Sequence, residues 1–230
     1  MRILRLAALL AACVTAGATG TGVAAAQSGC SDLQGTVGPD GVCKVHVQNA
    51  IYTLDMSFPN DYPDQSPLVA YLTQARDGFV NVAEDPDANN LPYQMDADGA
   101  GYRSGPPTGG TRSVVFTVWQ NVGGAHPQTF YQAFNWNVAT SAPITFDTLF
   151  KAGTKPLDVI YPEVNKYLQK QGMIDPLAQS AGLDPAKYQN FALTDDALLF
   201  FFSQGEMLAE SAGPVQASVP RAAVAPMLAL

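Results

Sequence analysis

Alternating apolar and polar residues predict the strands of this protein. Leu54, Met56 and Phe58 are separated by single polar residues, a period of two that buries one face of a strand. Two later runs rich in β-branched and aromatic residues flank a glycine-bearing loop and predict a β-hairpin. The candidate strands are residues 51–58, 93–103, 113–120, 128–136, 198–202 and 215–219.

Helical spacing marks two of the segments between these strands. Leu68 and Leu72 belong to an apolar stripe that predicts a helix over residues 66–83, with Asp64 or the serine at its start as the N-cap. A second stripe predicts a helix over residues 158–170. Mostly antiparallel strands with interspersed helices, and no regular alternation of strand and helix, indicate the α+β class.

The N-terminal segment has the pattern of a signal peptide. Arg2 and Arg5 precede a short apolar run, and alanines 24–26 supply the small residues that signal peptidase needs, so we predict removal of residues 1–26. A lipoprotein cleavage site at Cys13 is the less favoured alternative. Neither this run nor any later stretch has the length of a good membrane span. We therefore expect a secreted protein, free or associated with the cell wall.

A glycine- and proline-rich stretch suggests where the mature chain divides. Residues 99–111 contain seven Gly or Pro residues and predict a linker. The expected domains are an N-terminal α+β domain at residues 27–106 and a C-terminal domain at residues 107–230.

Two cysteines remain after the signal peptide, Cys30 and Cys43. They have neither a redox CxxC spacing nor the spacing of a metal site. In an exported chain such a pair predicts one disulfide, here within the N-terminal domain.

Composition and charge narrow the classes of function. The formal net charge is −8 and only 14% of residues are charged, so strong nucleic-acid binding is excluded. The chain has two histidines and no HExxH or phosphate-binding glycine motif, so a three-histidine zinc site is impossible. Alternating acidic residues at 85–89 lack the pattern of a calcium loop and indicate a solvated turn. We expect a monomer with no cofactor and no metal.

Serine hydrolysis is the enzyme class that the sequence leaves open. The full G-x-S-x-G motif is absent, and no histidine follows His126, which excludes the residue order of an α/β-hydrolase. Ser203 follows the apolar strand 198–202 and precedes Glu206. If that strand runs antiparallel to residues 128–136 in one sheet, Ser203, His126 and Glu206 can form a catalytic triad. The alternative is a His126 ring that only fixes its own loop.

Several short motifs together resemble one known family over nearly the whole mature chain. They resemble the mycobacterial secreted immunogenic-protein family, most closely its branch of cell-wall-associated esterases. The C-terminal part is also similar to the extracellular domain of RsiV, an anti-sigma factor that senses lysozyme by binding it. The motifs are NDYPDQ at 60–65, GGAHP at 123–127, ITFDTLF at 144–150, GLDPAKYQNFALTDD at 182–196 and FFF-x-x-GE at 200–206.

The resemblance implies a signal peptide, one disulfide and two α+β pieces, the second of them β-grasp-like, in a mycobacterial or related actinobacterial protein. It implies a secreted serine-type esterase acting on short acyl esters, which we take as the first hypothesis. The second hypothesis is a non-catalytic extracellular domain that binds a protein such as lysozyme, or peptidoglycan.

The turn before the first long helix is the candidate binding surface. Asp61, Tyr62 and Asp64 combine an aromatic ring with acids, a set that can anchor a cationic partner when it is exposed. The alternative is a purely local role in the turn and in capping the helix.

Overall fold

The computed structural model describes residues 29–172 and 177–230. The signal peptide expected at residues 1–26 and the alternative lipidation site Cys13 lie outside these residues. Within the described residues, no helix is both long enough and apolar enough to cross a membrane.

Seven strands form one mixed sheet in the order of the chain. All neighbouring pairs are antiparallel except β3 and β4, which are parallel and are joined by the long helix α2. This strand–helix–strand unit was not predicted from the sequence. The elements, in chain order, are α1 (Gly29–Asp32), β1 (Thr36–Val37), β2 (Val42–Gln48), β3 (Tyr52–Pro59), α2 (Gln65–Ala83), β4 (Tyr93–Ser104), β5 (Thr111–Asn121), β6 (Gln128–Asn137) and β7 (Ala142–Pro143).

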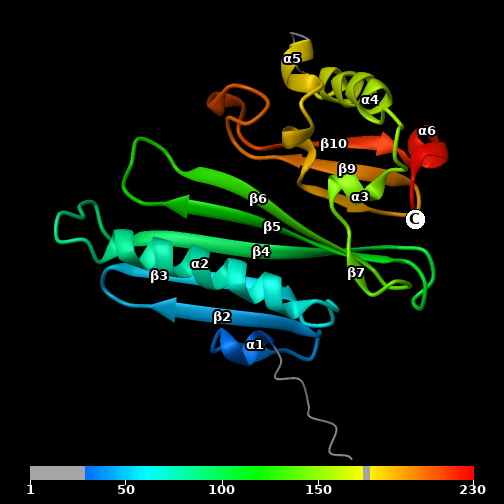
Figure 1. The fold of residues 1–230 in the computed structure, drawn as a ribbon. Helices are drawn as coiled ribbons and strands as arrows, with labels where there is room; N and C mark the ends of the chain where they lie inside the picture. The colour runs from blue at the N-terminus through cyan, green and yellow to red at the C-terminus, as the bar shows by residue number, and fades with distance from the viewer. Residues whose placement is uncertain (1–28, 173–176) are drawn as a thin grey trace, which may run out of the picture.

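The rest of the chain forms a second, three-stranded antiparallel sheet with the order β10-β9-β8. Figure 1 shows this sheet beyond β6, with α4 on its outer side. Its elements and helices are α3 (Phe146–Leu149), α4 (Leu157–Lys170), α5 (Gln179–Gly182), η1 (Pro185–Tyr188), β8 (Phe191–Leu193), β9 (Ala197–Phe202), η2 (Glu210–Ala212), β10 (Val215–Pro220), α6 (Arg221–Val224) and η3 (Ala225–Met227).

The predicted α+β class is confirmed, with a mixed rather than purely antiparallel main sheet. The predicted hairpin is β5–β6, and the two predicted helices are α2 and α4 to within one residue at their ends. The β-grasp likeness of the C-terminal part stays a prediction.

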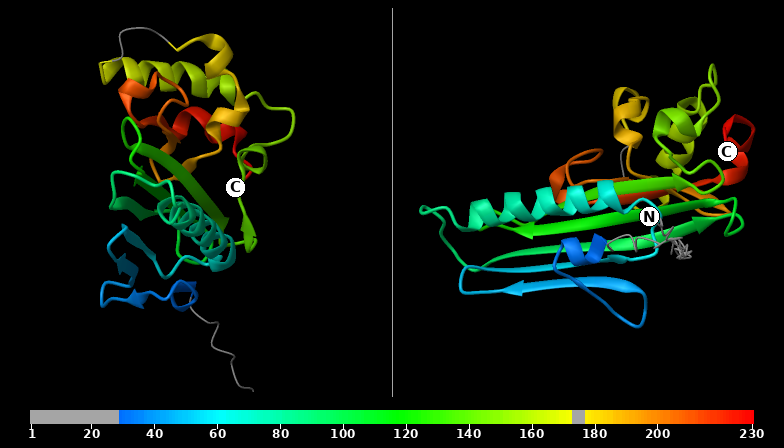
Figure 2. Two further views of the ribbon diagram at one scale, coloured as in Figure 1. Left: turned by 90° about the vertical axis from the view of Figure 1, so that its left-hand side faces the viewer. Right: turned by 60° about the horizontal axis from the view of Figure 1, so that its bottom comes forward.

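Apolar side chains leave β5 in both directions. Val114 and Phe116 pack beneath α2, in a core that also contains Leu68 and Leu72. Val115, which points to the opposite face, packs with Phe201 of β9. The views in Figure 2 show the long strands β4 to β6 lying between α2 and the C-terminal elements. The main sheet is therefore covered on one face by a helix and on part of the other by a second sheet.

The glycine-rich stretch is not a linker over its full length. β4 continues to Ser104 and β5 begins at Thr111, so only residues 105–110 form the connecting turn. A Cβ added at Gly99 would lie 2.8 Å from the Phe116 ring, and one at Gly110 would lie 2.0 Å from the Ser104 carbonyl oxygen. These glycines permit close packing rather than flexibility. The predicted boundary between residues 106 and 107 falls in this turn, and strands from both sides of it share one sheet.

The predicted disulfide between Cys30 and Cys43 is confirmed. It ties α1 to β2 across 13 positions of sequence, and both cysteines are buried. A Cβ at Gly35 would lie 2.8 Å from each sulfur, so the bridge occupies space that only glycine leaves free.

Replacing both cysteines by serine is expected to lower the free energy of unfolding by about 3 kcal/mol, because the open chain gains entropy when unfolded. Urea unfolding of the exported chain measures this loss. Chemically reduced wild-type protein is the control and should unfold at nearly the same urea concentration as the double variant. An unchanged midpoint in both samples would contradict the expectation.

Candidate functional site

Ser203 and Glu206 form a tight turn at the end of β9. The Glu206 amide donates to the Ser203 carbonyl oxygen (3.0 Å), and the Ser203 amide donates to the Glu206 carboxylate (2.8 Å). Gly205 supplies the positive φ of 77° that such a turn requires at its third residue. In this structure the Glu206 carboxylate is thus a cap for the turn.

The Ser203 hydroxyl oxygen accepts a hydrogen bond from the Tyr131 amide at 3.0 Å. Gln204 bonds Thr129 twice, through its backbone amide and its side-chain oxygen. The end of β9 therefore runs antiparallel beside the start of β6, as the triad hypothesis requires. However, β9 and β6 belong to different sheets, whereas the triad hypothesis assumed that they share one sheet.

The His126 ring lies at the β5–β6 loop, with hydrogen-bonding groups near Nδ1 and a carboxylate farther from Nε2. Its Nδ1 is 3.3 Å from the Gln128 side-chain nitrogen and 3.1 Å from the Pro127 carbonyl oxygen. Its Nε2 is 3.6 Å from a carboxylate oxygen of Glu210, rather than of Glu206. Among the described residues, no hydrogen bond joins the side chains of Ser203, His126 and Glu206. The structure places the three in one corner of the molecule without assembling them, and their catalytic role stays a prediction.

The other histidine has the geometry of an oriented base. His46 on β2 is the register partner of Asp55 on β3, and its Nδ1 lies 2.7 Å from the Asp55 carboxylate. With Nδ1 donating to that carboxylate, Nε2 is left as the acceptor and has no partner in the described parts of the chain. His46 and Asp55 meet only because of the β2–β3 register, and this register cannot be predicted from the sequence alone. The pair was therefore not predicted.

Polar side chains share one face of strands β2, β3 and β4, which we call the open face. They are Lys44, His46, Asp55, Ser57, Asp96 and Asp98. The Ser57 hydroxyl donates to the Asp98 carboxylate on the neighbouring strand. Asp96 lies beside Asp55 in register, and partial burial together with the Asp55 charge raises the pKa of Asp96 above its usual value. In the described residues, no three His, Cys, Asp or Glu side chains are grouped so as to hold a metal ion.

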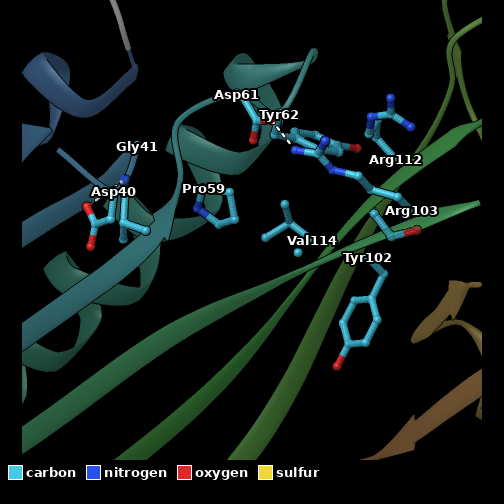
Figure 3. Close-up of a pocket in the computed structure, with 12 residues that line it drawn as sticks. Asp40, Gly41, Pro59, Asp61, Tyr62, Tyr102, Arg103, Arg112 and Val114 are labelled. Atoms are coloured by element: carbon cyan, nitrogen blue, oxygen red, sulfur yellow. Dashed lines mark hydrogen bonds and ion pairs between the residues drawn. The ribbon is translucent and has the colours of Figure 1, made fainter. Parts of the chain in front are cut away.

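Two of the three predicted binding residues, Asp61 and Tyr62, line a cavity of about 430 Å³ near the start of α2 (Figure 3). Asp61 pairs with Arg103 of β4. Tyr62 is only 5% exposed and packs into the core under α2, so the expected exposed aromatic is wrong. Burial and, to a smaller extent, the charge of Asp64 raise the pKa of Tyr62. Asp64 occupies the N-cap position of α2, although its side chain accepts no capping hydrogen bond there.

Known proteins resemble this chain over its full length. Esterase Rv3036c of Mycobacterium tuberculosis is 52% identical over 228 residues, which cover 99% of each chain. Immunogenic protein MPT64 of the same species and immunogenic protein MPB64 of Mycobacterium bovis are each 43% identical over 222 residues, 96% of this chain and 97% of theirs. The chain belongs to this mycobacterial esterase and immunogenic-protein family. The predicted family is thereby confirmed.

Two further comparisons concern the C-terminal part and the fold. A family model described as "Protein of unknown function (DUF3298)" matches residues 147–222, within the segment for which RsiV similarity was predicted. Solved structures of DUF3298 proteins from Bacteroides fragilis and Pseudomonas aeruginosa superpose with TM-scores of 0.51 and 0.56. They share 13% and 12% identity, and the matches cover 82% and 81% of this chain and 93% of each of theirs. At this identity the likeness shows the fold alone.

Replacing Asp96 by Asn is expected to raise the free energy of unfolding at pH 7 by about 0.5 kcal/mol, because it removes like-charge repulsion across two strands. A raised folded-state pKa makes the ionised form costly, so the gain should vanish once the carboxyl is protonated, below about pH 3. Urea unfolding at the two pH values measures the difference.

Asp98→Asn on the same strand is the matched control for this prediction. It should bring no gain, because the Asp98 carboxylate accepts the Ser57 hydroxyl. Equal stabilisation by the two variants, or a gain from Asp96→Asn that persists at low pH, would contradict the repulsion between Asp55 and Asp96.

Proposed function

We propose that this protein is an exported carboxylic-ester hydrolase that acts on short acyl esters. The observation that carries the proposal is the 52% identity, over 99% of both chains, to a protein named an esterase. The Cys30–Cys43 disulfide supports the export, because such bridges persist in oxidising compartments outside the cytoplasm. Association with the cell wall, as in the resemblance from which the hypothesis began, forms part of the same proposal.

The histidine count limits the possible mechanisms. The chain has two histidines, so an imidazole base must be His46 or His126. Nδ1 of His126 is hydrogen-bonded and its Nε2 lies 3.6 Å from the Glu210 carboxylate. Nδ1 of His46 is held by Asp55 at 2.7 Å, and its Nε2 has no partner among the described residues. A base must have a free acceptor nitrogen and gains from a group that fixes its tautomer. We therefore favour His46 as the general base.

With His46 as the base and Asp55 beside it, water and the ester are the only reactants that the hydrolysis needs. The water oxygen attacks the carbonyl carbon while its proton passes to Nε2 of His46. Asp55 stabilises the resulting imidazolium through Nδ1. The tetrahedral intermediate collapses by breaking the bond to the alkoxy oxygen, which takes the proton from His46. The products are the carboxylic acid and the alcohol. The exposure of the pair, 60% for His46 and 49% for Asp55, suits small soluble esters.

Hydrolysis of p-nitrophenyl butyrate, by protein purified from a host without contaminating esterases, tests the proposal. His46→Ala is expected to lower kcat/KM by at least about 100-fold, the usual contribution of a general base. Because His46 is exposed, the variant should keep the wild-type unfolding midpoint. His126→Ala and Ser203→Ala are the matched comparisons and should retain most of the activity.

Two other results would change the conclusion in different ways. Loss of activity in His126→Ala and Ser203→Ala, with His46→Ala unaffected, would reject His46 and support the triad predicted from the sequence. Wild-type protein no faster than buffer would reject the esterase function itself. It would favour the alternative of a non-catalytic domain that binds an extracellular protein or peptidoglycan.

A further inference from the structure

The cavity beside α2 is separate from both histidines and has a mixed lining. Its floor is formed by Gly101 and Val114, and Pro59 and Tyr62 form an apolar wall. A Cβ at Gly101 would lie 3.1 Å from Pro59, so the absence of a side chain there keeps the space open. A volume of about 430 Å³ is within the range of small-ligand sites.

Two arginines stand side by side at this cavity. Arg103 on β4 and Arg112 on β5 are register partners, so their side chains leave the sheet on the same face. Like charges directly opposite on neighbouring strands are unfavourable. Two carboxylates also line the cavity: Asp61 pairs with Arg103, and Asp40 pairs with Lys44. Arg112 bonds only the neutral carbonyl oxygens of Thr111 (2.9 Å) and Pro107 (3.3 Å). In the part of the chain that the structure describes, no carboxylate compensates Arg112.

A third donor comes from the other wall. The Tyr62 ring is buried, yet its hydroxyl has no hydrogen-bond partner among the described residues. In the view of Figure 3 the hydroxyl end of the Tyr62 ring is turned toward the Arg112 side of the cavity. Because the pKa of Tyr62 is raised, this hydroxyl stays protonated and can donate at any physiological pH.

We propose that this cavity binds a small organic anion through its carboxylate or phosphate group. The head group takes hydrogen bonds from the guanidinium of Arg112, from Arg103 and from the Tyr62 hydroxyl. The apolar remainder lies against Pro59 and Val114. Arginine forks match the oxygens of carboxylates and phosphates, and the Tyr62 hydroxyl, which has no hydrogen-bond partner among the described residues, can donate to the same oxygens.

The existing ion pair does not block such a ligand. Asp61 and Arg103 are each 63% exposed, and exposed pairs contribute little to stability. Arg103 engages Asp61 through a single nitrogen, which leaves its other donors available. Arg112 likewise uses two N–H groups on carbonyl oxygens and keeps three. Neither His46 nor Asp55 lines this cavity, so anion binding here is independent of the ester hydrolysis proposed above.

Amide NMR spectra of isotope-labelled protein, titrated with butyrate, butyramide and inorganic phosphate, test the site. Butyrate and phosphate are expected to shift the amide resonances of residues 101–103 and 112–114, whereas the uncharged butyramide should not. Tyr62→Phe, which keeps the buried ring, should weaken binding about three- to tenfold. Arg112→Gln should weaken it at least about tenfold.

Arg76→Gln is the matched control, because it removes the same charge from α2 and should leave affinity unchanged. Shifts by neither anion, equal shifts by butyramide, or equal losses in Arg112→Gln and Arg76→Gln would each overturn the proposal. If Arg112→Gln unfolds, Tyr62→Phe decides alone. Sedimentation with phosphatidylglycerol vesicles but not phosphatidylcholine vesicles, lost in Tyr62→Phe, would identify the anion as a lipid head group. Binding of soluble anions without sedimentation would identify it as a free acid or phosphate.

Discussion

Strands β5 and β6 must be covered on both faces, because large apolar side chains leave them in both directions. Val114 and Phe116 need the cover of α2, and Val115 and Tyr131 need that of β8 and β9. Burial of these side chains is the main favourable term available to the fold. It places the helix on one side of the main sheet and the C-terminal sheet on the other, and hence decides which surfaces remain free.

On the face of the main sheet opposite α2, the part that β8 and β9 do not cover remains exposed. There the strands carry polar side chains, and His46 and Asp55 face each other in solvent. His126 lies instead at the β5–β6 loop, where its Nδ1 is hydrogen-bonded and its Nε2 lies 3.6 Å from the Glu210 carboxylate. The two imidazoles thus differ in how closely protein groups approach Nε2, and for this reason we favour His46 as the base of the proposed hydrolysis. Beneath the start of α2, the ends of β4 and β5 leave a cavity lined by two arginines and two carboxylates, and neither carboxylate pairs with Arg112.

The sequence predicts local elements well and tertiary neighbours poorly. Leu54 and Phe58 show the period of their strand, and Cys30 and Cys43 have one available partner each, so these features were predictable. The parallel pairing of β3 with β4 was not, because no local pattern shows that α2 crosses back along the sheet. His46 carried no motif, since its partner comes from strand register. Tyr62 was expected in solvent because turn composition does not reveal the core beneath it.

The three phenylalanines of β9 divide their side chains between two layers. Phe200 and Phe202 pack under α4, and Phe201 turns the other way onto Tyr131. The family match at residues 147–222 includes β9 and excludes β5 and β6. In this chain the matched stretch therefore does not cover its own outward ring: Phe201 is buried only because Tyr131 and Val115, upstream of the match, pack against it.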